Sequence, residues 1–272
     1  MTIKRVDRGK NHWYVDTETG DRVPGVTTIT DGGLPKKALI NWAANATAEA
    51  AIDRWDELAE LTPSVRLKTL QGARYAVKDA AAKQGTKVHN LAEKLVHGER
   101  VTVPDEIAGH VQSYTRFLDE FDVRPILVEK TVHSATHNYC GTFDLIADLL
   151  NPDDPEPDPE QRNRITALLD LKTNRSGIFG ETALQLAGYR YADMWVDDDG
   201  NEYEIPEVDM CGAVHVRTDG YSLIPLEVTP LQHRQFLYVQ QVAQFDQTSR
   251  ELVGEPIEPP YASTYRLVRE DT

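Results

Sequence analysis

An acid and an amine lie two positions apart at the end of an apolar run. Residues 165–173 read Ile-Thr-Ala-Leu-Leu-Asp-Leu-Lys-Thr, a composition that predicts a buried strand. Because strand side chains alternate between faces, Asp170 and Lys172 point to one side, while Leu169 and Leu171 point into a core. The pair is either an ordinary surface ion pair, worth under about 1 kcal/mol, or part of a site for acid, base or metal chemistry.

Three further short patterns of polar residues could join this pair. In the first, a histidine and a glutamate lie one helical turn apart and share a helix face. Each pattern taken singly has a structural explanation: a hydrogen-bonded histidine, a turn or cap acid, or ordinary packing. The patterns are Gly85-x-x-x-His89-x-x-x-Glu93, Gly141-Thr142-Phe143-Asp144 and Gln185-x-x-x-Tyr189.

The elements that must position these residues follow from hydrophobic periodicity, which predicts an α/β protein with a mixed central sheet flanked by helices. Strands are expected at 125–133, 139–149, 165–173, 208–217 and 221–228, with β-prone runs at 13–15 and 26–29, and the first two and last two strands form hairpins. Helices are expected at 35–55, 63–83, 85–98, 104–121, 182–196 and 229–251. The acidic, proline-rich segment 151–164 is expected to be an exposed loop, and the tail from Gly254 to wrap the surface.

Composition limits the classes of function. A chain of 272 residues with 40% hydrophobic content buries a sizeable core. Its net charge of −15 argues against a broad, non-specific coat on duplex DNA, but not against a small site where metal ions neutralise acids and phosphates together. Cys140 and Cys211 are too few for a disulfide scaffold and are expected to be reduced, buried thiols. Without a signal peptide or membrane span, the sequence predicts a soluble cytoplasmic protein.

Other chemical motifs are excluded. Residues 197–200, Asp-Asp-Asp-Gly, hint at a calcium loop, but aligning Gly200 to the sixth position puts Trp195 at the first, where a ligand belongs. That rules out an EF-hand. The chain has neither a phosphate-binding G-x-x-x-x-G-K sequence nor a G-x-S-x-G nucleophile elbow.

Taken in order, the polar patterns resemble the PD-(D/E)xK nuclease superfamily, specifically its RecB-type and phage exonuclease branch. The resemblance covers about residues 85–190, and residues 23–29, Val-Pro-Gly-Val-Thr-Thr-Ile, look like the opening of many phage members. It implies a restriction-endonuclease-like core in a single nuclease domain, 1–272. Within that domain we expect N-terminal strands and a helical elaboration at 1–84, a catalytic core at 85–228, and a closing helix and tail at 229–272.

The resemblance also implies roles for individual residues. His89, Asp144, Asp170 and the backbone carbonyl of Leu171 would hold one or two divalent ions, while Lys172 would attend the attacking water. Glu129 matches a further catalytic acid of many relatives. The candidates for site support or DNA binding are Gln185, Tyr189, Glu93, Arg175, Arg74 and Lys78.

The chain departs from the family pattern in two places. Some relatives carry a four-cysteine iron–sulfur cluster, which the two cysteines here cannot form, so no such cluster is expected. The spacing between Asp144 and Asp170 is stretched by the acidic loop, which we interpret as an insertion at a hairpin tip.

The chemistry of the residues agrees with a divalent metal. Mg²⁺ prefers oxygen ligands and uses one or two carboxylates, and a histidine in the shell also suits Mn²⁺. Lys172 has two possible roles, which the sequence leaves open. As a base it needs a pKa lowered from about 10.4, whereas as an ammonium it stabilises anionic charge.

The expected function is a metal-dependent DNA exonuclease of phage or bacterial recombination, replication or repair. Its expected substrate is a DNA end or single-stranded region, and recombination or replication proteins are candidate partners. Basic residues of the N-terminal half either line a DNA passage or form a solvated face: Arg66, Lys68, Arg74, Lys78, Lys83 and Lys87. The alternatives are an endonuclease of a defence system and a non-catalytic nucleic-acid- or protein-binding module, the latter favoured by the net charge.

Overall fold

A computed structural model describes residues 3–8, 11–258 and 260–261 of the chain. The elements, in chain order, are β1 (Ile3–Arg8), β2 (Asn11–Asp16), β3 (Arg22–Val23), α1 (Val26–Gly33), α2 (Lys37–Asp53), α3 (Trp55–Glu60), α4 (Pro63–Val96), η1 (Asp105–Ile107), α5 (Ala108–Glu120), β4 (Arg124–Ser134), β5 (Tyr139–Leu150), β6 (Arg164–Lys172), α6 (Glu181–Arg190), β7 (Met194–Val196), β8 (Glu202–Tyr203), β9 (Met210–Arg217), β10 (Gly220–Pro225), α7 (Pro230–Thr248) and η2 (Ser249–Leu252).

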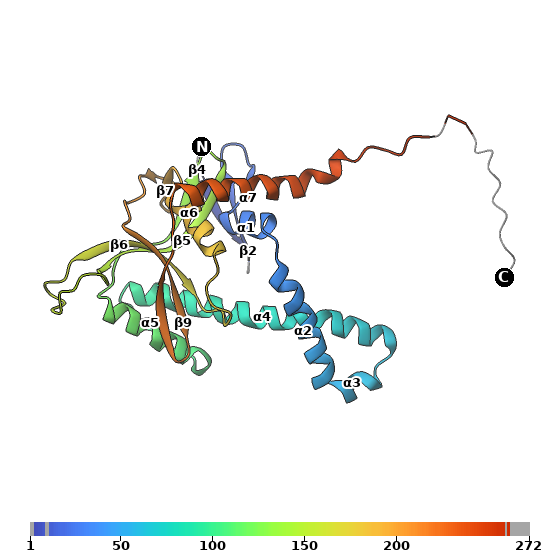
Figure 1. Ribbon diagram of the computed structural model, residues 1–272, viewed down its shortest axis with the longest axis horizontal. Coiled ribbons are helices and arrows are strands. Elements are labelled where there is room, and N and C mark those ends of the chain that lie inside the picture. Colours follow the sequence, from blue (N-terminus) through green and yellow to red (C-terminus); the bar gives the residue numbers. More distant parts are fainter. Residues whose placement is uncertain (1–2, 9–10, 259, 262–272) are drawn as a thin grey trace.

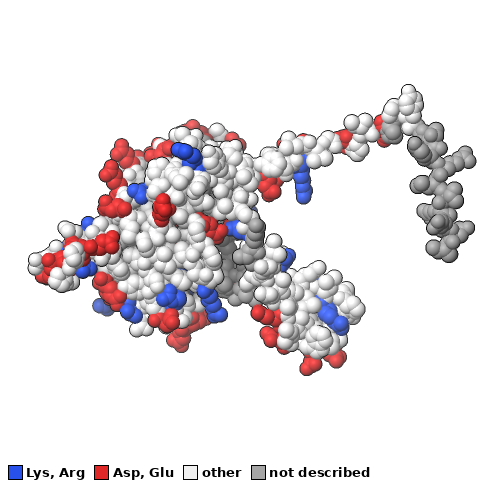
Figure 2. Space-filling model, viewed as in Figure 1, with Lys and Arg blue, Asp and Glu red and all other residues white. Residues whose placement is uncertain are grey.

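The central sheet is mixed, as the sequence predicts. Its seven strands lie in the order β10-β9-β6-β5-β4-β7-β8. Only β6 and β9 run parallel, and every other neighbouring pair is antiparallel. The acidic segment between β5 and β6 is a loop at a hairpin tip, because the two strands pair regularly up to Leu150 and Arg164 on either side of it. Figure 2 shows acidic side chains gathered on this projecting loop.

Helices cover both faces of the sheet (Figure 1). One face packs against α1, α6 and α7 through a cluster that includes Phe143 and Leu168. The other packs against α4 and α5 through a cluster that includes Leu169 and Leu171. Leu168 and Leu169 are adjacent in β6 and lie on opposite faces, so the alternation expected of a strand divides this segment between two cores.

A second, three-stranded sheet of β1, β2 and β3 lies against the first residues of β5. Ile3, Tyr14 and Val23 form a small core with Cys140, and Cys140 N–H donates to the carbonyl of Pro24 at 2.9 Å. After α1 the chain forms an arm of α2, α3 and the first half of α4, which extends from the body in Figure 1. The second half of α4 returns under the central sheet.

Two sequence predictions about the N-terminal half are wrong. Residues 26–29 form the start of helix α1 instead of a strand, because Val26 and Ile29 share one helix face and are both buried in the α6 and α7 core. The helices expected at 63–83 and 85–98 are one helix, α4, which continues through Gly85. A glycine costs a helix only about 1 kcal/mol, and the alanine-rich flank of Gly85 favours continuation.

Two predictions about the C-terminal half are also wrong. The helix expected to reach residue 196 ends at Arg190, and Trp195 instead lies in β7, where it stacks on Tyr203. The tail does not wrap the surface over its described residues, since it runs away from the body and Ile257 is 94% exposed. Both expected hairpins and the closing helix are confirmed.

Both cysteines are free and buried, as expected, and burial raises the pKa of each thiol. None of the helices in the described part of the chain combines the length and apolar character needed to cross a bilayer.

The close approach of α6 to β5 depends on Gly141. An added Cβ there would lie 2.5 Å from Cε1 of Tyr189 and 2.9 Å from Cγ2 of Val26, both in buried side chains. We therefore expect Gly141→Ala to lower the free energy of unfolding by about 1–3 kcal/mol, the usual cost of overpacking. Thermal and urea unfolding measure the change.

Gly72→Ala is the matched control. This residue lies inside α4 and has no atom within 4 Å of an added Cβ, so the substitution should stabilise the protein by up to about 1 kcal/mol. Equal stability of Gly141→Ala and the wild type would show that β5 and α6 can move apart freely.

Candidate metal centre

The side chain of Asp144 lies where β5 and β6 separate. The two strands are paired up to Leu145 and Leu169, and pairing stops there. Beyond that point Oδ2 of Asp144 accepts a hydrogen bond from the backbone N–H of Leu171 at 2.7 Å. Because the N–H and C=O of one strand residue point to the same side, the carbonyl of Leu171 also faces this gap.

The backbone is irregular at the same level of the sheet. Glu129 of β4 has a φ of +48° inside a strand, which is uncommon for a residue other than glycine. On β5, Phe143 and Ile146 contact the same core although they are three positions apart, so the alternation of faces changes between them. The irregularity turns Glu129 and Asp144 toward one site. Backbone strain of this kind costs on the order of 1–3 kcal/mol and is concentrated at functional sites.

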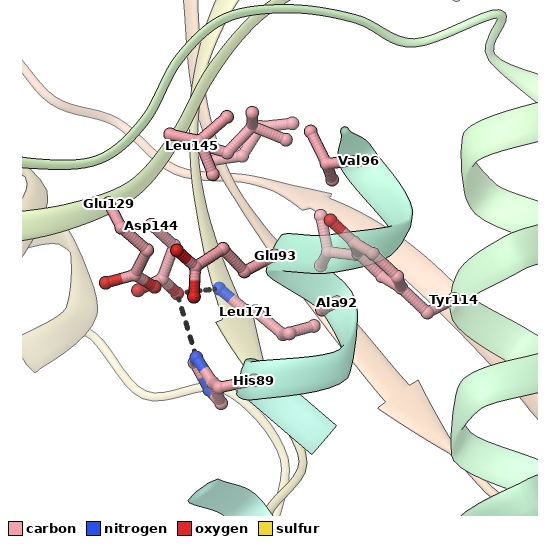
Figure 3. Close-up of a pocket in the computed structure, with 12 residues that line it drawn as sticks. His89, Ala92, Glu93, Val96, Tyr114, Glu129, Asp144, Leu145 and Leu171 are labelled. Atoms are coloured by element: carbon pink, nitrogen blue, oxygen red, sulfur yellow. Dashed lines mark hydrogen bonds and ion pairs between the residues drawn. The ribbon is translucent and has the colours of Figure 1, made fainter. Parts of the chain in front are cut away.

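Three elements bring together a cluster of possible metal ligands. His89 of α4, Glu129 of β4 and Asp144 of β5 each offer a ligand atom, and these atoms lie within 4.8 Å of one another. Nδ1 of His89 is 3.7 Å from Oδ2 of Asp144, and Figure 3 shows Glu93 directed toward the same place. The four side chains line a cavity of about 20 Å³, which is room for one water molecule or ion.

The cluster carries more negative charge than its surroundings balance. Burial first, and then the charges of Asp144 and Glu93, raise the pKa of Glu129 to about 8, while Arg5 acts in the opposite direction. Burial, with a contribution from Asp144, raises the pKa of Asp170 to about 6 against the effect of Lys172. A divalent cation among these donors would offset the repulsion, so the donor set fits a metal.

Asp170 and Lys172 project together toward α6, as strand alternation predicts. Asp170 is buried, and its Oδ1 accepts a hydrogen bond from Nε2 of Gln185 at 2.9 Å. Nζ of Lys172 lies 2.6 Å from Oδ2 of Asp170 and donates to Oε1 of Gln185 at 3.3 Å. Gln185 also donates to the hydroxyl of Tyr189 at 3.0 Å, so α6 holds both ends of the pair.

The protonation state of Lys172 follows from this pairing. Burial lowers the pKa of its amine, but the Asp170 carboxylate, with smaller contributions from Asp144 and Glu181, outweighs burial and raises the pKa above its ordinary value. Lys172 is therefore an ammonium at neutral pH. Of the two roles that the sequence leaves open, this pairing favours the cation.

Two of the three expected ligand side chains lie in the cluster, and the third does not. His89 and Asp144 belong to the cluster, and Glu129 occupies the third place in it. Asp170, expected to be a ligand, lies outside this group of three and is held by Lys172 and Gln185. Its buried Oδ2 is the oxygen that lies 2.6 Å from the Lys172 ammonium, so this charge pair occupies the carboxylate.

A groove of about 1380 Å³ runs past the cluster, between the N-terminal sheet, α4 and the central sheet. Lys83 and Lys87 of α4 line it, together with Asp170, Lys172 and the rim loop 197–200.

Glu93, Gln185 and Tyr189 also line this groove, whereas Arg66, Lys68, Arg74 and Arg175 do not. Arg66 donates to the carbonyls of Leu58, Ala59 and Leu61 around the end of α3, which is a structural role. Arg74 packs over the ring of Tyr75, 4.7 Å from its centroid. Lys68 and Arg175 are exposed, and the side chain of Lys78 lies outside the described residues.

The groove also contains residues that the sequence did not identify as candidates. Arg5, His12 and Tyr14 line it from the N-terminal sheet. The only local sign of their role is the two-residue spacing that places them on one face of β1 and β2. Such a pattern is common in ordinary surface strands and predicts no site by itself.

No protein-family model matches the chain, and no curated protein is significantly similar to it.

Glu129→Gln should stabilise the metal-free protein at alkaline pH. The pKa of Glu129 is about 8 in the folded state and 4.5 when unperturbed, so the folded state binds this proton more tightly than the unfolded state does. The resulting contribution to the stability of the fold is fully present below about pH 4.5 and is lost as the pH rises through 8. Glutamine does not ionise. In thermal unfolding with EDTA, the variant should gain a Tm advantage of roughly 2–4 °C at pH 9, equal to about 1 kcal/mol, which disappears near pH 5.

The exposed Glu204 supplies the control, since Glu204→Gln should leave the pH dependence unchanged. A Glu129→Gln variant that is less stable than the wild type at pH 9 would mean that the ionised carboxylate is stabilised by its surroundings.

Proposed function

We propose that the chain is a metal-dependent phosphodiesterase that degrades DNA as an exonuclease, with a PD-(D/E)xK-type nuclease core. One observation carries the proposal. Acids from β4 and β5 and a histidine from α4 meet beside a paired acid and lysine of β6, at the point where the central strands separate. The mixed sheet with helices on both faces is compatible with this class of enzyme.

The metal site of the proposal consists of His89, Glu129 and Asp144, with the carbonyl of Leu171 as a fourth candidate ligand. One nitrogen and several oxygen donors suit Mn²⁺ and Mg²⁺. A divalent cation held by these residues would supply Lewis-acid chemistry, lowering the pKa of a bound water molecule and offsetting charge on the leaving oxygen.

The residues of β6 and α6 have supporting roles in the proposal. The Lys172 ammonium stabilises negative charge on the phosphate oxygens, a role that agrees with its raised pKa. Gln185 fixes both Lys172 and Asp170 through its two hydrogen bonds, and Tyr189 fixes Gln185. These bonds keep the charged groups in place before a substrate arrives, which is the arrangement that electrostatic catalysis requires.

The groove supports a polymeric, phosphate-containing substrate. Its volume of about 1380 Å³ exceeds the roughly 300–1,000 Å³ of a pocket for a small molecule. Among the described residues, five lysines and arginines line it together with nine acids, three of which, Glu93, Glu129 and Asp144, lie at the proposed metal site. Part of the excess acid lies on the loop between β5 and β6, which projects from the body in Figure 2.

Metal binding should be measurable without activity. Mn²⁺ at about 100 times its dissociation constant should stabilise the wild type by about 2.7 kcal/mol, seen as a higher Tm. His89→Ala should weaken the Mn²⁺-dependent shift because a ligand is lost. His97→Ala is the control, since His97 lies on the same side of the sheet but outside the cluster and groove. An equal shift in His89→Ala and the wild type would contradict the proposed ligand set.

Hydrolysis of end-labelled linear DNA with Mg²⁺ or Mn²⁺ tests the activity. Asp144→Asn and Lys172→Ala should each reduce the cleavage rate by about 100-fold or more, the effect of removing a group that acts on the reacting atoms. Asp170→Ala should also reduce the rate, because it removes the carboxylate that holds the Lys172 ammonium. Asp219→Asn and Lys94→Ala change exposed residues outside the groove and should cleave like the wild type. No metal-dependent cleavage by the wild type would favour a non-catalytic binding module.

The form of the DNA separates the two nuclease activities. An exonuclease should degrade linear DNA and leave a covalently closed circle intact, because the circle offers no end. Parallel incubations followed by gel electrophoresis give the answer. Linearisation of the circle at a rate comparable to degradation of the linear form would identify an endonuclease instead.

A further inference from the structure

One face of the N-terminal sheet forms a wall of the groove opposite α4. Arg5 of β1 pairs across the sheet with Tyr14 of β2, so both side chains lie on the same face. Both residues line the groove together with His12 and the metal-ligand candidates. Arg5, which lies 84 residues before His89 in the sequence, thus reaches the site.

The guanidinium of Arg5 is held beside β5 but is not saturated. Its Nε donates to Oδ1 of Asp7 at 3.2 Å, and its Nη1 donates to Oγ1 of Thr142 at 3.4 Å. A guanidinium has five N–H donors, so three of them have no hydrogen-bond acceptor among the described residues. The side chain is 33% exposed, which leaves these donors open to a ligand in the groove.

Thr142 links Arg5 to the strand that carries Asp144. Its hydroxyl lies 2.8 Å from the hydroxyl of Tyr14, so the N-terminal sheet and β5 are joined at the place where Arg5 is held. Thr142 precedes Asp144 by two residues, a distance of roughly 6–7 Å along a strand. A ligand group bound by Arg5 would therefore lie beside the metal centre and not on it.

Arginine differs from the other cations of the groove. Lys172 is paired with Asp170, Lys87 with Glu106 and Arg5 with Asp7, and Lys4 and Lys83 also line the groove. Arg5 is the only arginine among the described residues that line the groove. Its planar group donates two parallel hydrogen bonds to a phosphate, which a lysine cannot do.

We propose that Arg5 binds the DNA phosphate adjacent to the one that is cut, so that the N-terminal sheet forms part of the substrate-binding site. The inference rests on the proposed function for the identity of the ligand. Arg5 is a substrate-binding residue in this scheme, and Thr142 and Tyr14 position it.

Binding of a fluorescent single-stranded oligonucleotide, followed by anisotropy in Ca²⁺, tests the contact. Arg5→Ala should weaken binding about 10-fold, as expected for the loss of a charged hydrogen bond, and Arg5→Lys should recover only part of it. The slope of log K against log salt concentration should fall by about one unit in Arg5→Ala, which a merely structural role would not cause. Arg22→Ala removes an arginine that packs over Trp13 in the same sheet, outside the groove, and should bind like the wild type.

A neutral methylphosphonate at the phosphate next to the cleavage position locates the contact. It should slow cleavage by the wild type about 10-fold. It should not slow cleavage by Arg5→Ala, because that variant has no guanidinium to interact with the phosphate charge that the methylphosphonate removes. An equal slowing of both proteins would overturn the assignment.

The outcomes distinguish this inference from the proposed function. A wild type that cleaves DNA, with Arg5→Ala unchanged in affinity and salt slope, refutes the role of Arg5 and leaves the nuclease standing. A wild type that binds DNA through Arg5 but does not cleave it supports the contact and refutes the nuclease. A wild type that neither binds nor cleaves DNA overturns both.

Discussion

The hydrogen bond from the backbone of Leu171 to the carboxylate of Asp144 is the contact on which the candidate site depends. It forms where the β5–β6 ladder stops, so a side chain replaces the backbone acceptor that regular pairing would have supplied. The bond keeps the two strands in register while leaving the gap between them open to other groups. It also fixes the orientation of Asp144, and with it the short approach to His89.

The site is electrostatically unfavourable, and the surrounding fold stabilises it. Glu129 combines a positive φ with a pKa raised to about 8, both of which cost stability in the metal-free protein at neutral pH. Hydrophobic cores on both faces of the sheet, built around residues such as Phe143 and Leu169, offset this cost. A rigid sheet between two cores can hold like charges together, since separating them would require the strands themselves to move.

The distribution of charge matters more here than its total. The net charge of −15 argues against a surface that coats DNA, yet Arg5, Lys83 and Lys172 all line the groove. Acidic residues are concentrated on the loop between β5 and β6, which belongs to neither face of the core. The overall charge would then disfavour non-specific binding. In the described part of the chain the groove itself is lined by nine acids and five cations, and a divalent metal ion at the acidic cluster would offset part of this negative charge.

The sequence by itself determined the features that depend on local period and composition. Alternation in residues 165–173 places Asp170 and Lys172 on one side of β6, and helical spacing places His89 and Glu93 on one face of α4, because both patterns arise within a few residues of chain. The tertiary structure alone decided which groups meet. Glu129 joins the ligand cluster through a backbone irregularity that no propensity encodes, whereas Asp170 is drawn to Lys172 and Gln185. Arg5 reaches the groove by contacting Thr142, 137 residues away, and a contact between segments so distant leaves no periodic signal in the sequence.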